Sequence, residues 1–448
     1  MGIFRAYDIR GIYPKDLNEK IALKIGKAFG TYNPGKIVVG MDTRLSSPSL
    51  KKALIKGLKS TSAKVIDIGI VTTPMVMFAT RHLKCDGGIM VSASHNPKQY
   101  NGFKLFRKNG IPISYESGIK EVQKIFGREK FKKGKGTLVK EDITDEYLHF
   151  LLNKIDLKPP INLKVVVDAG NGPAGIITPR VLKELGITVY ELYCKPDGRF
   201  PNHEPNPSKP ENLVDIKKKV IKENANIGFA YDGDGDRVAV IDDNGNVVYV
   251  GVVFSILIEN ILSKKPGSKI VYTPLDSQAI EDVIKRHGGV PLVCRVGHTF
   301  ITQKMLKEDA SLAGEISGHY YFKEIYGADD ALFASLKLIE SLVKSGKDFD
   351  DYAKSLPKYY SEVSEALRVP IKESEKFKFI EKLKKEFKKK EYKISTIDGV
   401  KVFLKDGWAL FRPSNTEAVI SMSYEAKTKK GLERMKKFVN KIKKKIPR

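Results

Sequence analysis

The chain has 448 residues, 41% of them hydrophobic and 29% charged, a composition that excludes a disordered chain and fits a folded globular protein. This length is too great for one hydrophobic core and indicates three or four domains. The formal net charge of +26 favours anionic partners, but it does not choose between small molecules and nucleic acid.

Alternating strand and helix patterns fill the first half of the chain and predict βαβ units with a largely parallel sheet. Strands are expected at 36–40, 65–68, 87–91, 163–167 and 226–230, and helices at 47–59, 115–126 and 145–153. A third unit then alternates a helix to Leu262, a strand at 269–272, a helix from Asp276 and a strand ending at Val293. Asp329-Asp330 is expected to cap a later helix.

The last unit, from about Glu362, has short strands and two lysine-rich helices and reads as α+β. We therefore expect an α/β protein with three related mixed α/β domains and a C-terminal α+β domain. The expected boundaries are 1–155, 156–250, 251–361 and 362–448. Residues 371–448 hold 24 basic against 10 acidic residues, and a solvated helix surface is favoured over a nucleic-acid surface because no recognition motif accompanies the charge.

Cysteine usage and hydropathy bear on the compartment. Cys85, Cys194 and Cys294 lie far apart and form no Cys-x-x-Cys pair, which argues against disulfides or a zinc knuckle and favours a reducing cytoplasm. The N-terminal residues contain no apolar signal core, and the longest apolar run, 247–258, is too short to span a bilayer. We expect a cytoplasmic protein that is not inserted in a membrane.

The segment Val91-Ser92-Ala93-Ser94-His95-Asn96-Pro97 follows an apolar run that predicts a buried strand. Polar loops at such strand ends are where open α/β sheets bind ligands, so Ser94 is the expected phosphoryl carrier. Sequence neighbours on an extended loop point to opposite sides, and His95 is therefore expected to be a poor general base for Ser94. A turn or capping role for these side chains remains open.

A second loop, Asp232-Gly233-Asp234-Gly235-Asp236-Arg237, carries three carboxylates at alternate positions. If they converge to about 5 Å, each pair repels by roughly 3 kcal/mol at an effective dielectric near 20. A divalent cation removes that cost, and all-oxygen ligation suits Mg²⁺. Arg237 stands where a calcium loop requires glycine, so an EF-hand is excluded, while a purely structural turn remains the alternative.

Two further loops carry groups suited to a sugar phosphate. Glu315 and Ser317 place a carboxylate and a hydroxyl two residues apart, which suits neighbouring sugar hydroxyls. A turn further on offers a guanidinium, hydroxyls and backbone N–H groups, which suit a phosphate dianion, and its residues are Arg412, Ser414, Asn415 and Thr416. For both loops a plain turn is the alternative.

With these four loops in order, the chain resembles the α-D-phosphohexomutase family, and most closely its phosphomannomutase/phosphoglucomutase branch. The resemblance implies four domains around a deep cleft, Ser94 as the phosphoserine, and Mg²⁺ held by the phosphoserine and by Asp232, Asp234 and Asp236. It implies that Tyr7, Arg10 and Lys104 lie near the phosphoserine. Arg237, directly after the acidic ligands, is expected to contact the phosphoryl oxygens of the substrate. Lys104, Arg10 and His319 are then the catalytic candidates, and Gly297-His298 matches the loop that senses sugar identity.

The implied reaction interconverts hexose 6-phosphate and hexose 1-phosphate through a hexose 1,6-bisphosphate, which also serves as activator. Mannose and glucose phosphates are preferred over glucosamine phosphate, because Ile316 stands where the phosphoglucosamine branch typically has Gln. Ala418 departs from the usual Pro of the last loop. The expected partners are small sugar phosphates, with nucleic acid disfavoured and homo-oligomerisation left open. The rival functions are phosphoglucosamine mutase, a sugar-phosphate phosphatase and a basic nucleic-acid-binding protein on a relic mutase fold.

Overall fold

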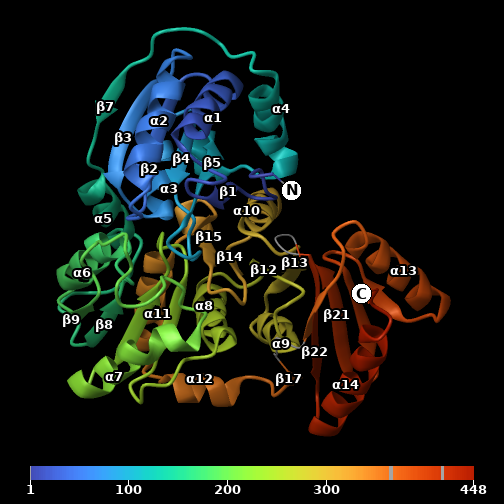
Figure 1. Cartoon of the computed structure of the whole chain (residues 1–448). Helices are drawn as coiled ribbons and strands as arrows, with labels where there is room; N and C mark the ends of the chain where they lie inside the picture. Colours follow the sequence, from blue (N-terminus) through green and yellow to red (C-terminus); the bar gives the residue numbers. More distant parts are fainter. Residues whose placement is uncertain (1, 363–366, 415–417, 448) are drawn as a thin grey trace. The chain divides into compact units, whose positions relative to one another are not determined.

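The computed structural model describes residues 2–362, 367–414 and 418–447 and divides into two compact units. The first unit comprises residues 1–257 and 317–349, and the second comprises 258–316 and 350–448. Figure 1 shows the elements of both units in sequence colours, and each unit is described by itself.

The first unit begins with a seven-stranded mixed sheet in the order β1-β5-β4-β2-β3-β7, with β6 paired to β5. The neighbours β4, β2, β3 and β7 run parallel, whereas β5 is antiparallel to both β4 and β1. The strands are β1 (Ile9–Ile12), β2 (Lys36–Met41), β3 (Lys64–Ile70), β4 (Gly87–Val91), β5 (Tyr100–Arg107), β6 (Ile111–Pro112) and β7 (Leu138–Lys140).

A second sheet of this unit has the order β11-β10-β8-β9, parallel except for the hairpin strand β11. Its strands are β8 (Lys164–Asp168), β9 (Thr188–Leu192), β10 (Ile227–Tyr231) and β11 (Val238–Ile241). The short strands β15 (Tyr320–Phe322) and β16 (Ala328–Asp329) pair antiparallel in the same unit.

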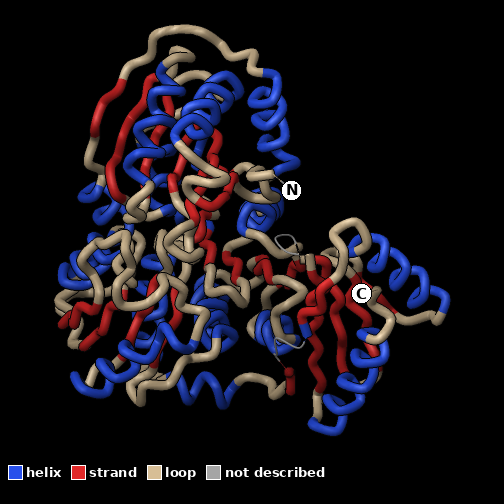
Figure 2. Tube along the Cα trace, in the orientation of Figure 1, coloured by secondary structure: helices blue, strands red, loops and turns tan. Residues whose placement is uncertain are grey.

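The helices of the first unit connect and cover these strands. They are α1 (Glu19–Tyr32), α2 (Ser47–Lys59), α3 (Thr73–His82), α4 (Lys120–Arg128), α5 (Thr144–Leu152), α6 (Ala174–Glu184), α7 (Val214–Glu223) and α11 (Ala331–Ser345), with short turns at Lys108–Gly110, Tyr115–Ile119, Pro210–Leu213 and Lys323–Ile325. α1 and α2 pack side by side (Figure 1), and a Cβ on Gly26 would lie 2.2 Å from the carbonyl oxygen of Leu54. Only glycine permits this approach, which places both helices over one apolar core with β2 and β4. From α4 to β7 the chain runs as a long loop (Figure 2).

The second unit combines a parallel set, β13-β12-β14, with an antiparallel sheet in the order β17-β22-β21-β20-β19, with β18 paired to β22. Its elements are β12 (Lys269–Tyr272), α9 (Gln278–Arg286), β13 (Val290–Val293), α10 (His298–Glu308), β14 (Leu312–Gly314), β17 (Tyr360–Glu362), β18 (Arg368–Pro370), α13 (Lys376–Lys389), β19 (Lys393–Ser395), β20 (Val400–Leu404), β21 (Gly407–Pro413), β22 (Val419–Ala426) and α14 (Lys429–Lys443). α8 (Val250–Lys264) and α12 (Phe349–Ser355) run across the divisions.

Most expected elements are present. The helix expected at 47–59 is α2, and the Asp330 side chain caps α11 by accepting from the Phe333 N–H at 3.0 Å. The segment expected as a helix from Tyr115 begins instead with a π-turn, because Gly118 breaks the helical backbone before α4. No helix in the described segments is both long and apolar enough to cross a membrane. The three cysteines are buried thiols that form no disulfide.

Candidate active site

The Ser94 loop follows β4 at the carboxyl end of the first parallel sheet, as the apolar run predicts. Arg44, on the loop after the neighbouring strand β2, is fully buried beneath it. Its guanidinium donates to the carbonyl oxygens of Ser94, Asn96 and Pro97 at 2.6–2.8 Å and pairs with Asp42 at 3.0 Å. Only arginine carries five N–H donors on one rigid group. Arg44 therefore sets the shape of the loop.

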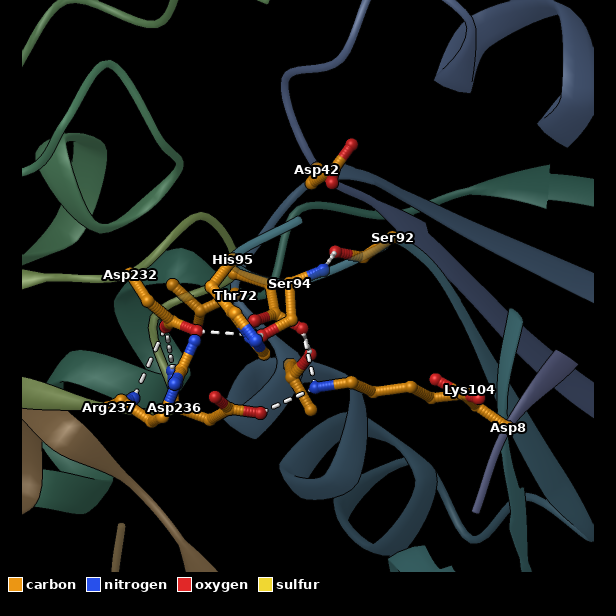
Figure 3. Close-up of polar contacts among 12 residues, drawn as sticks. Asp8, Asp42, Thr72, Ser92, Ser94, His95, Lys104, Asp232, Asp236 and Arg237 are labelled. Carbon is orange, nitrogen blue, oxygen red and sulfur yellow. Dashed lines mark hydrogen bonds and ion pairs between the residues drawn. The ribbon is translucent and has the colours of Figure 1, made fainter. Parts of the chain in front are cut away.

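The Ser94 hydroxyl meets the acidic loop of the second sheet. Ser94 Oγ donates to Asp232 Oδ2 at 2.7 Å, and Figure 3 shows the two side chains converging from separate loops. The expectation that Ser94 and His95 point to opposite sides is wrong: His95 Nδ1 lies 3.2 Å from Ser94 Oγ. The cause is that Ser94 has φ +51°, a left-handed backbone that turns the two side chains toward each other. Burial, aided by Arg237 and Arg10, lowers the pKa of His95 and keeps its imidazole neutral.

The acidic loop joins β10 to β11, and its three aspartates are buried and directed to one point. One carboxylate oxygen from each of Asp232, Asp234 and Asp236 lies within 4.8 Å of the others. Among the described residues, Asp234 Oδ1 has no hydrogen-bond partner. Buried carboxylate oxygens without donors are costly, so this oxygen-only set fits a hard divalent cation.

Basic side chains surround the same carboxylates (Figure 3). Lys104, from β5, places Nζ 2.6 Å from Asp234 Oδ2 and 2.5 Å from Asp236 Oδ2, and Arg237 Nε lies 3.0 Å from Asp232 Oδ2. Burial alone would lower the pKa of Lys104, but the surrounding carboxylates raise it well above its usual value. Burial and the adjacent Asp236 raise the pKa of Asp232 to about 6.

Two of the remaining candidates of the first unit, Arg10 and His319, contact the serine and acidic loops. Arg10, on β1, pairs with Asp8 and donates through Nη1 to Asn96 Oδ1 at 2.5 Å, which joins it to the Ser94 loop. Tyr7 lies half-buried just before β1. His319, before β15, places Nε2 3.3 Å from Asp236 Oδ1. Arg10 and His319 thus contact the serine and acidic loops from two further segments.

The sugar-directed candidates other than Ser317 belong to the second unit. Glu315 is buried just after β14, and His298 begins α10 directly after Gly297. Arg412 lies on β21 with Nε 3.0 Å from Asp398 Oδ2, and that same oxygen accepts from the Val296 N–H at 3.1 Å. Ser414 follows β21 with its carbonyl held by Lys376 Nζ at 2.8 Å. Ser317, in the first unit, contacts His319 Nδ1 at 2.8 Å. Asn415 and Thr416 lie outside the described residues.

Several residues that shape the site are absent from the sequence predictions. Arg44 and Asp42 hold the Ser94 loop, and Thr73, at the start of α3, donates to Asp234 Oδ2 at 2.6 Å. Asp398 connects Arg412 with the loop before His298. One signal existed: Asp42-Thr43-Arg44 follows the strand β2 as the Ser94 loop follows β4, and parallel neighbours end at one edge. Nothing local marks Thr73 or Asp398.

The fold and site together define a multidomain α/β protein with a buried serine–aspartate–lysine centre. Profiles of the phosphoglucomutase/phosphomannomutase family match its alpha/beta/alpha domain I at residues 1–133, domain II at 145–245, domain III at 252–360 and its C-terminal domain at 367–442. The chain therefore belongs to the phosphoglucomutase/phosphomannomutase family and has its four-domain architecture.

Individual relatives agree with this assignment along the whole chain. The phosphomannomutase/phosphoglucomutase of Pseudomonas aeruginosa is 38% identical over 447 residues, covering 98% of this chain and 95% of that protein. The phosphoglucomutase/phosphomannomutase of Thermococcus kodakarensis is 36% identical, with 95% of each chain covered. A crystal structure of a family protein from Burkholderia thailandensis matches with a TM-score of 0.90 at 36% identity, over 98% of this chain and 96% of that one.

Proposed function

We propose that this chain is a phosphomannomutase/phosphoglucomutase, an isomerase that interconverts hexose 6-phosphate and hexose 1-phosphate by way of phospho-Ser94 and a hexose 1,6-bisphosphate. The observation that carries the proposal is the 2.7 Å contact between Ser94 Oγ and Asp232 Oδ2, inside a buried cluster of three aspartates, Lys104 and Arg237. A hydroxyl held against a cation-binding acidic loop and flanked by fixed positive charge suits a phosphoryl group that must be received and released.

The acidic loop fits Mg²⁺, with Asp232, Asp234 and Asp236 as the protein ligands and a phosphoryl oxygen on Ser94 as a further one. When bound, the ion supplies Lewis-acid polarisation of the transferring phosphoryl group. The donorless oxygen Asp234 Oδ1 supports this assignment because an ion gives it a partner.

The chain's own side chains account for the transfer. The bond between phosphorus and Ser94 Oγ breaks as a new bond forms to the free hydroxyl oxygen of the sugar. We assign Lys104 and Arg237, which pair with carboxylates of the acidic loop, to the oxygens of the transferring phosphoryl group, and Arg10 to the binding of that group. We assign the proton of the attacking hydroxyl to His319, because imidazole exchanges protons most readily near neutral pH. The second half-reaction returns the other phosphoryl group to Ser94.

The sugar must present both of its ends to Ser94 in turn. The residues that recognise the sugar and its second phosphate must therefore differ from those that transfer the phosphoryl group. We assign the sugar hydroxyls to Glu315 and Ser317, sugar identity to Gly297 and His298, and the non-transferring phosphate to Arg412 and Ser414. The same phosphate role for Asn415 and Thr416 is an expectation from sequence. Tyr7 is assigned to substrate beside Arg10.

Mannose and glucose phosphates are the proposed substrates, and the glucosamine branch is disfavoured by Ile316. Coupled assays with mannose, glucose and glucosamine 1-phosphates, each with Mg²⁺ and a hexose 1,6-bisphosphate, test this directly. We expect turnover of the first two and at least tenfold lower kcat/KM for the third, about 1.4 kcal/mol in transition-state binding. Release of inorganic phosphate as the main product, or preference for glucosamine 1-phosphate, would contradict the proposal.

A cytoplasmic location is proposed from the three buried thiols.

A further inference from the structure

A second group of metal-ligating side chains lies beside the acidic loop, on the side of Asp236 away from Lys104. It consists of Asp236, His319 and Asp329, all in the first unit. β15 and β16 pair antiparallel with Asp329 opposite Tyr321, two residues after His319. Residues diagonal across such a pair lie on one face of the sheet, so the pairing itself brings His319 and Asp329 together.

The three ligand atoms face one another. His319 Nε2 lies 3.3 Å from Asp236 Oδ1 and 3.9 Å from Asp329 Oδ2. Both carboxylates are 1% exposed, and Asp329 Oδ2 has no hydrogen-bond partner among the described residues. Asp236 turns its other oxygen to Lys104, so its carboxylate faces two sites at once.

The spacing has a simple chemical reading. Ligands held about 2.1 Å from a tetrahedral zinc ion lie roughly 3.4 Å apart. The 3.3 Å separation matches that edge length, and the 3.9 Å separation is longer and would have to shorten when the ion binds. Two carboxylates balance a divalent charge, and one imidazole nitrogen favours Zn²⁺ over Mg²⁺. His319 Nδ1 contacts Ser317 Oγ at 2.8 Å, which is the outer hydrogen bond that orients a metal-binding histidine.

We propose that Asp236, His319 and Asp329 form a second cation site, selective for Zn²⁺ and related transition metals, that shares the Asp236 carboxylate with the acidic loop. A Zn²⁺ ion in this site would bind His319 Nε2, which could then no longer accept a proton, and would share the Asp236 carboxylate with Mg²⁺. Zn²⁺ is therefore expected to inhibit the enzyme while Mg²⁺ remains bound. The inhibitory consequence rests on the proposed function; the binding site does not.

Metal binding is measured without turnover, on the full chain with saturating Mg²⁺ present. Co²⁺ is the probe, because its visible absorption distinguishes tetrahedral sites with nitrogen ligands from octahedral oxygen sites. We expect one equivalent of tetrahedral Co²⁺, displaced by Zn²⁺, and at least tenfold weaker Zn²⁺ binding by Asp329→Asn. Asp243→Asn, which changes an exposed aspartate of the hairpin after β11, is the matched control and is expected to bind Zn²⁺ as the parent does.

X-ray absorption at the zinc edge of the parent protein gives a second measurement that needs no variant. One imidazole in the first coordination sphere, with oxygen atoms completing it, supports the site. An oxygen-only sphere, or undiminished Zn²⁺ affinity in a folded Asp329→Asn chain, overturns it. Zinc binding as predicted in a protein without mutase turnover would leave this site standing and remove only the proposed function.

Discussion

At the scale of single residues, the chemistry depends on side chains whose neighbours leave them little freedom. Ser94 has a left-handed backbone, and such conformations persist only where surrounding contacts enforce them. Arg44 does so by donating to the carbonyl of Ser94 itself and to carbonyls on either side of the turn. The hydroxyl is therefore presented to Asp232 before any substrate arrives, which reduces the ordering that catalysis requires.

His203 provides a residue-scale prediction on pH. Burial alone would lower its pKa, but the Asp168 carboxylate, 3.1 Å from Nε2, raises it above the usual value. A raised folded-state pKa stabilises the fold at low pH, and this contribution is lost as pH rises through that pKa. Replacing His203 by Gln should therefore cost more stability at about pH 5.5 than at about pH 8.5, measured by urea unfolding. The exposed His149→Gln is the control, and an equal loss at both pH values would contradict the assignment.

At the scale of elements, the serine loop and the acidic loop approach each other so closely at Gly233 that no Cβ fits there. A Cβ on Gly233 would lie 2.5 Å from the carbonyl oxygen of Ser94, so Gly233→Ala must push the acidic loop away from the serine. We expect the variant to fold and to lose at least 100-fold in kcat, because a displacement of about 1 Å is enough for such a loss. Gly127→Ala, where a Cβ meets nothing within 4 Å, should behave as the parent in both circular dichroism and turnover. Full activity in Gly233→Ala would mean that the two loops need not meet.

A second element-scale prediction concerns Asp398, in the turn between β19 and β20. Asp398 orients Arg412 through Nε and holds the Val296 N–H, so its loss should loosen phosphate recognition. We expect Asp398→Ala to raise KM for the sugar phosphate about tenfold, roughly 1.4 kcal/mol, with a smaller change in kcat. Asp406→Ala removes a comparable but exposed pair with Arg434 and should leave KM within about twofold. If KM is unchanged and only stability falls, Asp398 has no role in binding.

Much of this arrangement could be read from the sequence, and the parts that could not have a physical cause. Local apolar runs and turn residues predict strands such as β4 and loops such as 232–237. The contacts of Arg44 with Ser94 and of Thr73 with Asp234 join distant segments, and no local pattern encodes them. The geometry of His95 was mistaken because one positive φ reverses the expectation for an extended loop.

At the scale of the whole molecule, the net charge of +26 is expected to affect substrate binding through its long-range electric field and not through any one contact. A positive field attracts dianionic sugar phosphates and is screened beyond about 10 Å at 0.1 M salt. We expect KM to rise several-fold between about 20 and 200 mM KCl with little change in kcat. A control is Lys385→Gln, which removes one exposed positive charge from α13 and should alter KM by less than about twofold. Salt-independent KM would show that local contacts alone govern binding.

The central claim is that one hydroxyl, Ser94 Oγ, carries the phosphoryl group. The most direct test incubates the protein with radiolabelled glucose 1,6-bisphosphate and Mg²⁺, followed by peptide mapping and a mutase assay. We predict one labelled phosphate per chain on Ser94, and no label and at least a 1000-fold lower rate, about 4 kcal/mol, in Ser94→Ala. Ser92→Ala, which changes the nearest other hydroxyl of the loop, should still be labelled at Ser94. Label on another residue, or parent-like turnover in Ser94→Ala, would contradict the account.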